Sequence, residues 1–346
     1  MYPAGEDMLE LPARGVLRVI VPIRSWRVRR GGSRLYPALS WKGKAHRAAL
    51  RTWITLGGAR FTHRVTLKPG GGWPLGDLLR EDLPTLSTAA VSIGPHSPGQ
   101  KITAQIMDAR GHILGFAKYA DRSLTRSRVA NEARMLQTLP EGVGPRLVRF
   151  GPLGEGDLLV QTPVPGRSRQ PRLDIDDAQM RFLQRLIRPD DAFPASEHPF
   201  VEALYAQVGY YRRLLDSIVA VLGKAEWQLA YMHGDLAPWN LRWRRGECFA
   251  FDWECGWTAG LAYVDGAYTL IQVASLIRNL NPRHASRVVA ERLKARLPAP
   301  YSEAAPAIAA LGGLYTLLSW YPPSDGAWDK PSPQEQWLRA FAEAAV

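Results

Sequence analysis

The chain has 346 residues, of which 46% are hydrophobic and 22% charged, as in a globular protein with two or three lobes. No stretch approaches the roughly 18 apolar residues that span a bilayer, and the acidic start lacks an apolar export segment, so we expect a cytoplasmic protein. The two cysteines, Cys248 and Cys255, have no second pair nearby, which leaves a disulfide framework or a zinc site without support.

The formal net charge of +12 is distributed unevenly. Residues 1–88 carry 15 Lys/Arg against 6 Asp/Glu, whereas residues 167–346 carry 20 of each. A basic N-terminal quarter could meet nucleic acid, anionic lipid head groups or an acidic polymer, or it could be a solvated surface. The arginines of residues 24–30 alternate with Trp26 and Val28, which favours a solvated edge strand. We do not expect nucleic acid to be a partner, and a peripheral contact with an anionic surface or glycan stays an open alternative.

Residues 1–87 are predicted to form a basic α/β extension of unknown role. Apolar and alternating segments predict short strands at 15–23, 25–30 and 59–67, around a helix at 45–53. A run rich in glycine and proline at 69–76 predicts a loop.

Residues 88–166 are predicted to form a smaller, nucleotide-binding lobe. Strands are expected at 89–94, 101–108, 112–120, 147–151 and 157–164. Between the third and fourth strands, apolar residues recur at helical spacing from Leu124 to Leu139, and Pro140 follows where a helix could stop. The result is a five-stranded antiparallel lobe with one helix.

Residues 167–346 are predicted to be mainly helical and to hold the catalytic and acceptor sites. Long segments with apolar faces predict helices at 174–188, 199–223 and 302–320. Ser332 and Glu335 form a capping box around a proline, which predicts the start of the last helix.

Two short motifs in this last part point to chemistry. Residues 233–240 read His-Gly-Asp-Leu-Ala-Pro-Trp-Asn, and residues 251–254 read Phe-Asp-Trp-Glu after a short apolar strand. Phosphoryl transfer from a nucleotide uses such a set. Asp235 could accept the proton of an attacking hydroxyl, while Asn240 and Asp252 supply the hard oxygen ligands that Mg²⁺ prefers.

A lysine and an acid upstream complete this set. Lys118 lies at the end of an alternating strand, where its ammonium could hold inner phosphates of a nucleotide. Glu132 lies fourteen residues later in the predicted helix and could hold that lysine in place. A pair of this kind is more often a surface salt bridge, but its position before the Asp/Asn/Asp set favours the functional interpretation.

The order of strand lysine, helix glutamate, hinge, HGDLAPWN and FDWE resembles the protein-kinase-like fold. HGD in place of HRD, and DWE in place of DFG, resemble its small-molecule branch, the aminoglycoside phosphotransferase and choline kinase group. The resemblance covers about residues 88–346. It implies a bilobal α+β fold, an enzyme of the transferase class, and ATP and Mg²⁺ as cofactors.

The resemblance also implies roles for single residues. Asp235 would be the catalytic base, and Asn240 and Asp252 would be Mg²⁺ ligands. His233 would orient the catalytic loop, and Glu254 would contact either substrate or a neighbouring ligand. The remaining implied residues are Asp265 as a cap or clasp on the catalytic loop, and Gln161 to Val164 as backbone partners of adenine.

The phosphate-covering loop departs from the family's pattern. Residues 94–100 are not G-x-G-x-x-G, yet Gly94, Ser97 and Gly99 could present backbone amides to phosphate oxygens. This departure leaves the choice between ATP and GTP open.

The acceptor is expected to be a small molecule. Only twelve residues, Trp253 and the segment 254–264, separate Asp252 from Asp265 and the next helix, which is too short for a peptide-docking activation loop. Aminoglycosides are polycations, whereas the helical part is net neutral, so we favour a sugar or glycoside hydroxyl over antibiotic phosphorylation. The alternatives are an aminoglycoside phosphotransferase, a nucleotide-binding pseudokinase and a protein kinase.

Overall fold

The computed structural model describes residues 7–11, 18–35, 48–49, 52–53, 64–66, 74–94, 100–321 and 331–346. The chain divides into two compact units, one made of residues 1–137 and 145–163 and the other of residues 138–144 and 164–346. Within the described ranges, no helix combines the length and apolar character that crossing a bilayer requires. The helix predicted at 45–53 falls largely outside the described residues.

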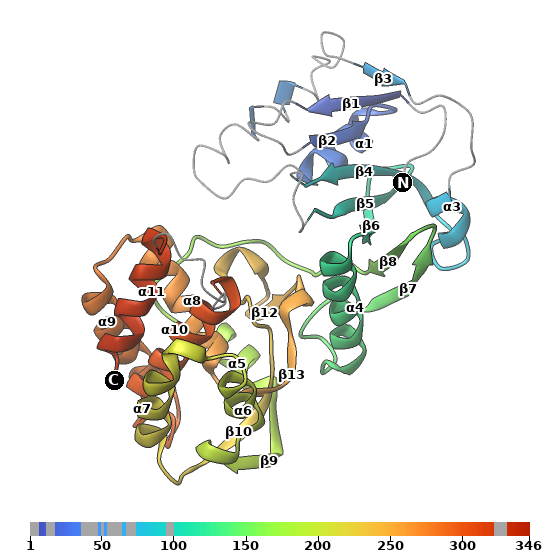
Figure 1. The fold of residues 1–346 in the computed structure, drawn as a ribbon. Helices are drawn as coiled ribbons and strands as arrows, with labels where there is room; N and C mark the ends of the chain where they lie inside the picture. The colour runs from blue at the N-terminus through green and yellow to red at the C-terminus, as the bar shows by residue number, and fades with distance from the viewer. Residues whose placement is uncertain are drawn as a thin grey trace. The chain divides into compact units, whose positions relative to one another are not determined.

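The first unit is built on one eight-stranded sheet whose neighbouring strands are all antiparallel (Figure 1). The strand order is β3-β1-β2-β4-β5-β6-β8-β7. In chain order the strands are β1 (Asp7–Leu11), β2 (Arg18–Pro22), β3 (Arg64–Thr66), β4 (Leu86–Ile93), β5 (Ile102–Asp108), β6 (Ile113–Ala120), β7 (Leu147–Leu153) and β8 (Gly156–Gln161).

Strands β4 to β8 occur where the sequence predicted them, with helix α4 (Ser123–Thr138) between β6 and β7. Strands β1, β2 and β3 continue the same sheet, because β2 pairs with β4. The sheet therefore runs across the predicted boundary at residues 87 and 88. The predicted boundary at 166 and 167 lies close to the division between the two units.

Helices pack on both faces of this sheet. Successive side chains of a strand point to opposite faces, so neighbouring residues of β4 contact different helices. Leu75 and Leu79 of α3 (Pro74–Leu79) pack with Ala89 and Val91 of β4 on one face. Val28 of α1 (Trp26–Gly32) packs with Ala90 and Met107 on the other face. The predicted loop at 69–76 is corrected at its end, since Pro74 already begins α3, where a proline at the first position is tolerated.

The edge strand predicted at residues 25–30 is wrong, because these residues lie in helix α1 (Trp26–Gly32). Ser25 caps the helix by accepting a hydrogen bond from the N–H of Val28 at 3.3 Å. Val28, Gly31 and Gly32 form the buried side of α1. The alternation that suggested a strand is a helical pattern with small residues, not large apolar ones, on its packed side.

The second unit is mainly helical, as predicted, with two small sheets (Figure 1). Helix α10 is buried along almost its whole length and contacts α7, α8, α9 and α11. The helices are α5 (Asp177–Arg185), α6 (Pro199–Tyr205), α7 (Arg212–Leu222), α8 (Val264–Gln272), α9 (Pro282–Arg296), α10 (Ala305–Trp320) and α11 (Pro333–Ala344). The strands are β9 (Ile187–Pro194), β10 (Glu226–Met232), β11 (Leu241–Arg244), β12 (Glu247–Ala250) and β13 (Trp257–Leu261).

Two predicted helices of this unit are shorter than expected. The segment 174–188 begins with a capping box at Asp176 and ends at Arg185, after which β9 pairs with β10. The segment 199–223 is divided into α6 and α7 around Gly209, which has a positive φ of 43°. The capping box of Ser332 and Glu335 at the start of α11 is confirmed. Together the two units confirm the predicted α+β class.

Candidate active site

The first unit holds a buried ion pair between Lys118 and Glu132. The ammonium of Lys118, on β6, lies 2.7 and 2.5 Å from the two carboxylate oxygens of Glu132, on α4. Both side chains are buried. Lys118 lies next to Ala117, whose side chain faces α3, so Lys118 projects from the opposite face of the sheet. The pairing that the sequence predicted is therefore present, with Glu132 fixing the lysine in one position.

The loop between β4 and β5 is anchored at both described ends. The side-chain amide of Gln100 donates a hydrogen bond to the carbonyl of Gly94 at 2.9 Å, and the N–H of Gly94 donates to the carbonyl of Lys101 at 3.2 Å. Arg122 donates to the Oε1 of Gln100 at 3.1 Å. Ser97 and Gly99, which the sequence suggested as phosphate contacts, lie outside the described residues.

The predicted adenine contacts follow the last strand of the first unit. Gln161 ends β8 and is buried, and its Oε1 has no hydrogen-bond partner within the described part of the chain. The N–H of Thr162 donates to the carbonyl of Arg146 at 2.9 Å. Val164 is the first residue after this stretch that belongs to the second unit.

In the second unit, Asp235 is held by two side chains that donate to different oxygens. The hydroxyl of Tyr268, on α8, donates to Oδ1 at 2.7 Å. The amide of Asn240 donates to Oδ2 at 3.3 Å and to the carbonyl of Asp235 at 2.9 Å. The carboxylate is therefore fixed in orientation, although it is only partly buried.

The surroundings of Asp235 make it a stronger base than an ordinary aspartate. Burial raises its pKa to about 6, and the negative charges of Asp252 and Glu254 act in the same direction. The hydrogen bonds from Tyr268 and Asn240 oppose this rise by stabilising the anion. At neutral pH the group is still mostly ionised, which suits a general base.

His233 is engaged at both ring nitrogens. Nδ1 accepts a hydrogen bond from the N–H of Asp235 at 3.2 Å, and Nε2 lies 3.0 Å from the carbonyl oxygen of Phe251. Because Nδ1 accepts, the proton belongs on Nε2, which donates to Phe251. The ring is fully buried and stacks obliquely against Trp253, with centroids 4.6 Å apart. His233 thus ties the two motifs together and has no free nitrogen for proton transfer.

Asp265 binds the backbone of the loop that carries His233 and Asp235. Its two carboxylate oxygens accept the N–H groups of His233 at 2.5 Å and Gly234 at 3.0 Å. Burial raises the pKa of Asp265 to about 7, while the two N–H donors favour the anion. Gly234 has a φ of +76°, and a Cβ there would lie 2.2 Å from the carbonyl oxygen of Cys255. The loop can take this path only with glycine at position 234.

Asp252 and Glu254 provide a pair of carboxylates beside this loop. Asp252 is a non-glycine residue in the left-handed region, with a φ of 73°, a strained conformation that often marks functional sites. A carboxylate oxygen of Asp252 and one of Glu254 lie within 4.8 Å of each other. The N–H of Phe251 donates to the carbonyl of Asn240 at 3.1 Å, which brings the second motif beside the first.

The donor atoms of this region fit Mg²⁺. Both partners of the Asn240 amide nitrogen are oxygen acceptors, so the side-chain oxygen must point the other way. That oxygen and the carboxylates of Asp252 and Glu254 are hard ligands of the kind that Mg²⁺ takes.

The sequence did not point to two residues beside Asp235. Tyr268 lies one helical turn after Asp265, so both face the same loop, and this spacing was the available signal. Trp320, at the end of α10, donates its indole N–H to the hydroxyl of Tyr268 at 3.3 Å. Its side chain remains 48% exposed. No sequence pattern links Trp320 to Tyr268, because the contact depends on how α10 packs against α8.

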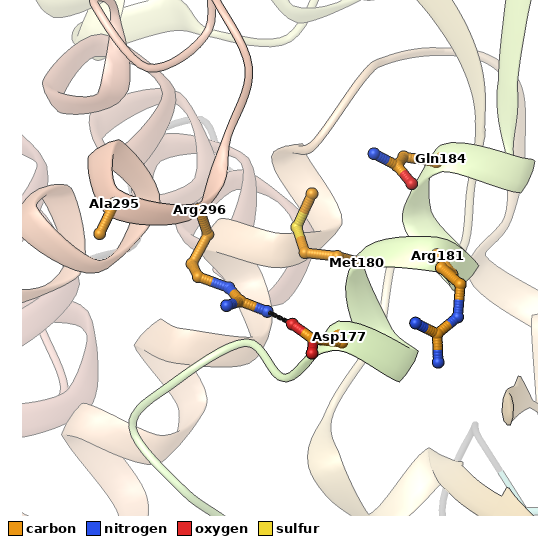
Figure 2. Close-up of a pocket in the computed structure, with 6 residues that line it drawn as sticks. All are labelled: Asp177, Met180, Arg181, Gln184, Ala295 and Arg296. Atoms are coloured by element: carbon orange, nitrogen blue, oxygen red, sulfur yellow. Dashed lines mark hydrogen bonds and ion pairs between the residues drawn. The ribbon is translucent and has the colours of Figure 1, made fainter. Parts of the chain in front are cut away.

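A separate shallow pocket of about 340 Å³ lies between α5 and α9. Figure 2 shows Arg296 reaching from α9 to Asp177 on α5, with which it forms an ion pair. None of the predicted site residues lines this pocket, whose lining is Asp177, Met180, Arg181, Gln184, Ala295 and Arg296.

No protein-family model matches the sequence, and no curated protein matches it. Among solved structures, a putative fructosamine-3-kinase from Haemophilus somnus 129PT is similar with a TM-score of 0.46 and 16% identity, over 78% of this chain and 95% of that one. A thermostable mutant of aminoglycoside phosphotransferase APH(4)-Ia, in complex with ADP and hygromycin B, has a TM-score of 0.46 and 10% identity, over 79% of this chain and 97% of that one. An ethanolamine kinase from Plasmodium vivax has a TM-score of 0.43 and 11% identity, over 86% of this chain and 88% of that one. Since these TM-scores lie below 0.5, we base the proposed function on the residues of the site.

Proposed function

We propose that this chain is a kinase that transfers the γ-phosphoryl group of ATP to a hydroxyl of a small molecule, with Asp235 as the general base. The observation that carries the proposal is the setting of Asp235. Its carboxylate is oriented by Tyr268 and Asn240, and its pKa is raised to about 6. A partly buried carboxylate with this pKa, next to a pair of hard-ligand carboxylates, suits proton removal from an alcohol during phosphoryl transfer.

In the proposed reaction the acceptor oxygen forms a bond to the γ-phosphorus as the bond to the ADP oxygen breaks. The hydroxyl proton passes to the carboxylate of Asp235. Mg²⁺, when bound, neutralises charge on the phosphate oxygens. Asn240, Asp252 and Glu254 are the residues that would hold it.

The other residues of the loop act by position. Tyr268 and Asn240 keep the two oxygens of Asp235 in fixed directions, so that one of them can meet the acceptor hydroxyl. His233 and Asp265 fix the backbone on which Asp235 is carried. In the first unit, Lys118 would contact inner phosphates of the nucleotide, and Glu132 would hold its ammonium in place.

A sugar or glycoside is our proposed acceptor. The second unit has no acidic surplus to bind a polycation, since residues 167–346 carry equal numbers of acidic and basic residues. Trp320 is half exposed and joined to Asp235 through the hydroxyl of Tyr268. Its flat apolar ring offers a surface for the carbon face of a sugar whose hydroxyl points toward the base. A cytoplasmic location belongs to the proposal, because the reaction consumes ATP.

The test is a screen of small hydroxyl compounds for Mg²⁺-dependent consumption of ATP by the purified protein. The panel includes neutral sugars, glycosides, aminoglycosides, choline and ethanolamine. We expect a neutral sugar or glycoside to stimulate turnover and to appear as a phosphorylated product by mass spectrometry. Rapid phosphorylation of an aminoglycoside, with sugars ignored, would overturn the proposed acceptor class. ATP binding without turnover for any compound would favour a pseudokinase.

A further inference from the structure

The first unit presents basic residues that the proposed catalysis does not use. Residues 11–76 contain 14 Lys/Arg and no Asp/Glu. Such segregation of charge over a long stretch creates a positive field that neighbouring acids do not cancel.

Five of these arginines lie on or beside helix α1. Arg24, Arg27, Arg30 and Arg34 are exposed, and Arg29 is partly buried. Among the residues that the structure describes, no carboxylate lies within ion-pair distance of any of the five. The charges of this cluster are therefore uncompensated by the described part of the protein.

Helical spacing places the exposed arginines together. Arg27, Arg30 and Arg34 are three and four residues apart, which puts them on one side of α1 and of the short 3-10 turn that follows it. Trp26 lies at the start of the same helix and is 48% exposed. We call Arg24, Trp26, Arg27, Arg30 and Arg34 the α1 arginine surface.

The opposite side of α1 is packed firmly against the sheet. A Cβ on Gly31 would lie 2.6 Å from the carbonyl oxygen of Gly111, and one on Gly32 would lie 2.6 Å from a methyl of Val21. Gln105, buried on β5, donates to the carbonyl of Gly31 at 2.9 Å. The arginines are therefore displayed by a helix that is fixed to the sheet, on the side that faces away from it.

Asp108, in the turn between β5 and β6 that lies against α1, already has hydrogen-bond partners. Asp108 accepts hydrogen bonds from the N–H groups of Arg110 and His112 at 2.8 Å, and from the His112 ring at 2.9 Å. Its carboxylate is thus committed to its own turn.

We propose that the α1 arginine surface binds the anionic surface of a lipid membrane. Guanidinium groups pair with lipid phosphates through two parallel hydrogen bonds, and clusters of four or more basic residues are typical of proteins that bind anionic lipid head groups. An exposed tryptophan beside the arginines fits the interface, where its amphipathic ring is favoured.

The geometry favours a membrane over a nucleic acid. Proteins that bind single strands offer open aromatic rings on which bases stack. Here the guanidinium of Arg27 already lies over the ring of Trp26, 5.5 Å from its centroid, and covers one of its faces. The packed helix presents a row of charges on its outward side, as a planar array of head groups requires.

The experiment is co-sedimentation of the full chain with vesicles. We would compare vesicles of phosphatidylcholine alone with vesicles that contain phosphatidylglycerol at about 30 mol%, a content that gives a negative surface potential. The variant Arg27→Gln/Arg30→Gln/Arg34→Gln removes three charges from the surface. The matched control, Arg283→Gln/Arg287→Gln/Arg292→Gln, removes three exposed charges from α9 in the other unit.

We expect the wild-type protein to bind the anionic vesicles, to be released by salt and to ignore phosphatidylcholine. The α1 variant should lower the partition coefficient about 100-fold, and Arg30→Gln alone about fivefold, while the α9 control stays close to wild type. If the triple α1 variant fails to fold, Arg30→Gln alone tests the proposal. Absence of binding, or equal losses in the α1 and α9 variants, would overturn the proposal. So would tighter binding to a single- or double-stranded oligonucleotide that displaces the vesicles.

Discussion

Replacing Tyr268 with phenylalanine should shift the titration of Asp235. The substitution removes a hydrogen bond of 2.7 Å to Oδ1 and leaves the buried ring in place. A hydrogen bond to a charged group is worth about 1.5 to 3 kcal/mol, and 1.36 kcal/mol corresponds to one pKa unit. Because this bond stabilises the anion, its loss should raise the pKa of Asp235 from about 6 to about 7 to 8.

Two measurements can detect this rise in the pKa of Asp235. The carboxyl carbon of Asp235, assigned by NMR against Asp235→Asn, reports its titration without an acceptor. The pH profile of kcat/KM reports the same group in the free enzyme. The base must be ionised, so the activity of wild type should fall about tenfold per pH unit below about 6. In the variant this fall should begin one to two units higher, with most activity regained at high pH.

Tyr205→Phe is the matched control, because the hydroxyl of Tyr205 donates to Asp216 at a similar 2.8 Å. This pair belongs to α6 and α7, away from the catalytic loop. The control should leave the profile unchanged. An unshifted titration in Tyr268→Phe would refute the account of how Asp235 is tuned, as would an equal shift in the control.

Three further substitutions test the supporting contacts. Glu132→Gln leaves the buried ammonium of Lys118 without its charge partner, so we expect about 3 to 5 kcal/mol of lost stability by denaturant unfolding; a loss below about 1 kcal/mol would argue against a tight pair. Asp265→Ala leaves two N–H groups of the catalytic loop unpaired and should cost about 1 to 3 kcal/mol per group, with lower kcat; unchanged kcat would show that the clasp is dispensable. Trp320→Leu should raise the acceptor KM and leave the KM for ATP unchanged, and the reverse pattern in initial rates would remove Trp320 from the acceptor site.

Sequence reasoning was most successful where function constrains residue types at fixed spacing. The pairing of Lys118 with Glu132 was predicted from their order along the chain. The five strands β4 to β8 followed from period-two alternation, which is strong when one face of a strand is buried. The capping box at Ser332 was equally local and equally visible.

Contacts between distant segments explain what was missed. Helix α1 was taken for a strand because its buried side contains Gly31 and Gly32, which give no apolar signal. The helix predicted at 174–188 extended into the first two residues of β9, Ile187 and Arg188, since the ladder partner β10 lies far along the chain. Tyr268 was signalled only by its spacing from Asp265 on α8, and Trp320 reaches Tyr268 only through the packing of α10 against α8, which no local pattern specifies.

In the proposed reaction, Asp235 removes the acceptor proton and does not hold the nucleotide. The most direct measurement compares Asp235→Asn with wild type in two assays, phosphoryl transfer to the acceptor found in the screen and binding of Mg²⁺-ATP by calorimetry. We expect transfer by Asp235→Asn to fall at least about 100-fold while its affinity for the nucleotide stays near wild type, whereas Lys118→Ala and Asp252→Ala should lose affinity as well. Transfer that persists in Asp235→Asn, or an equal loss of nucleotide affinity in all three variants, would contradict this role of Asp235.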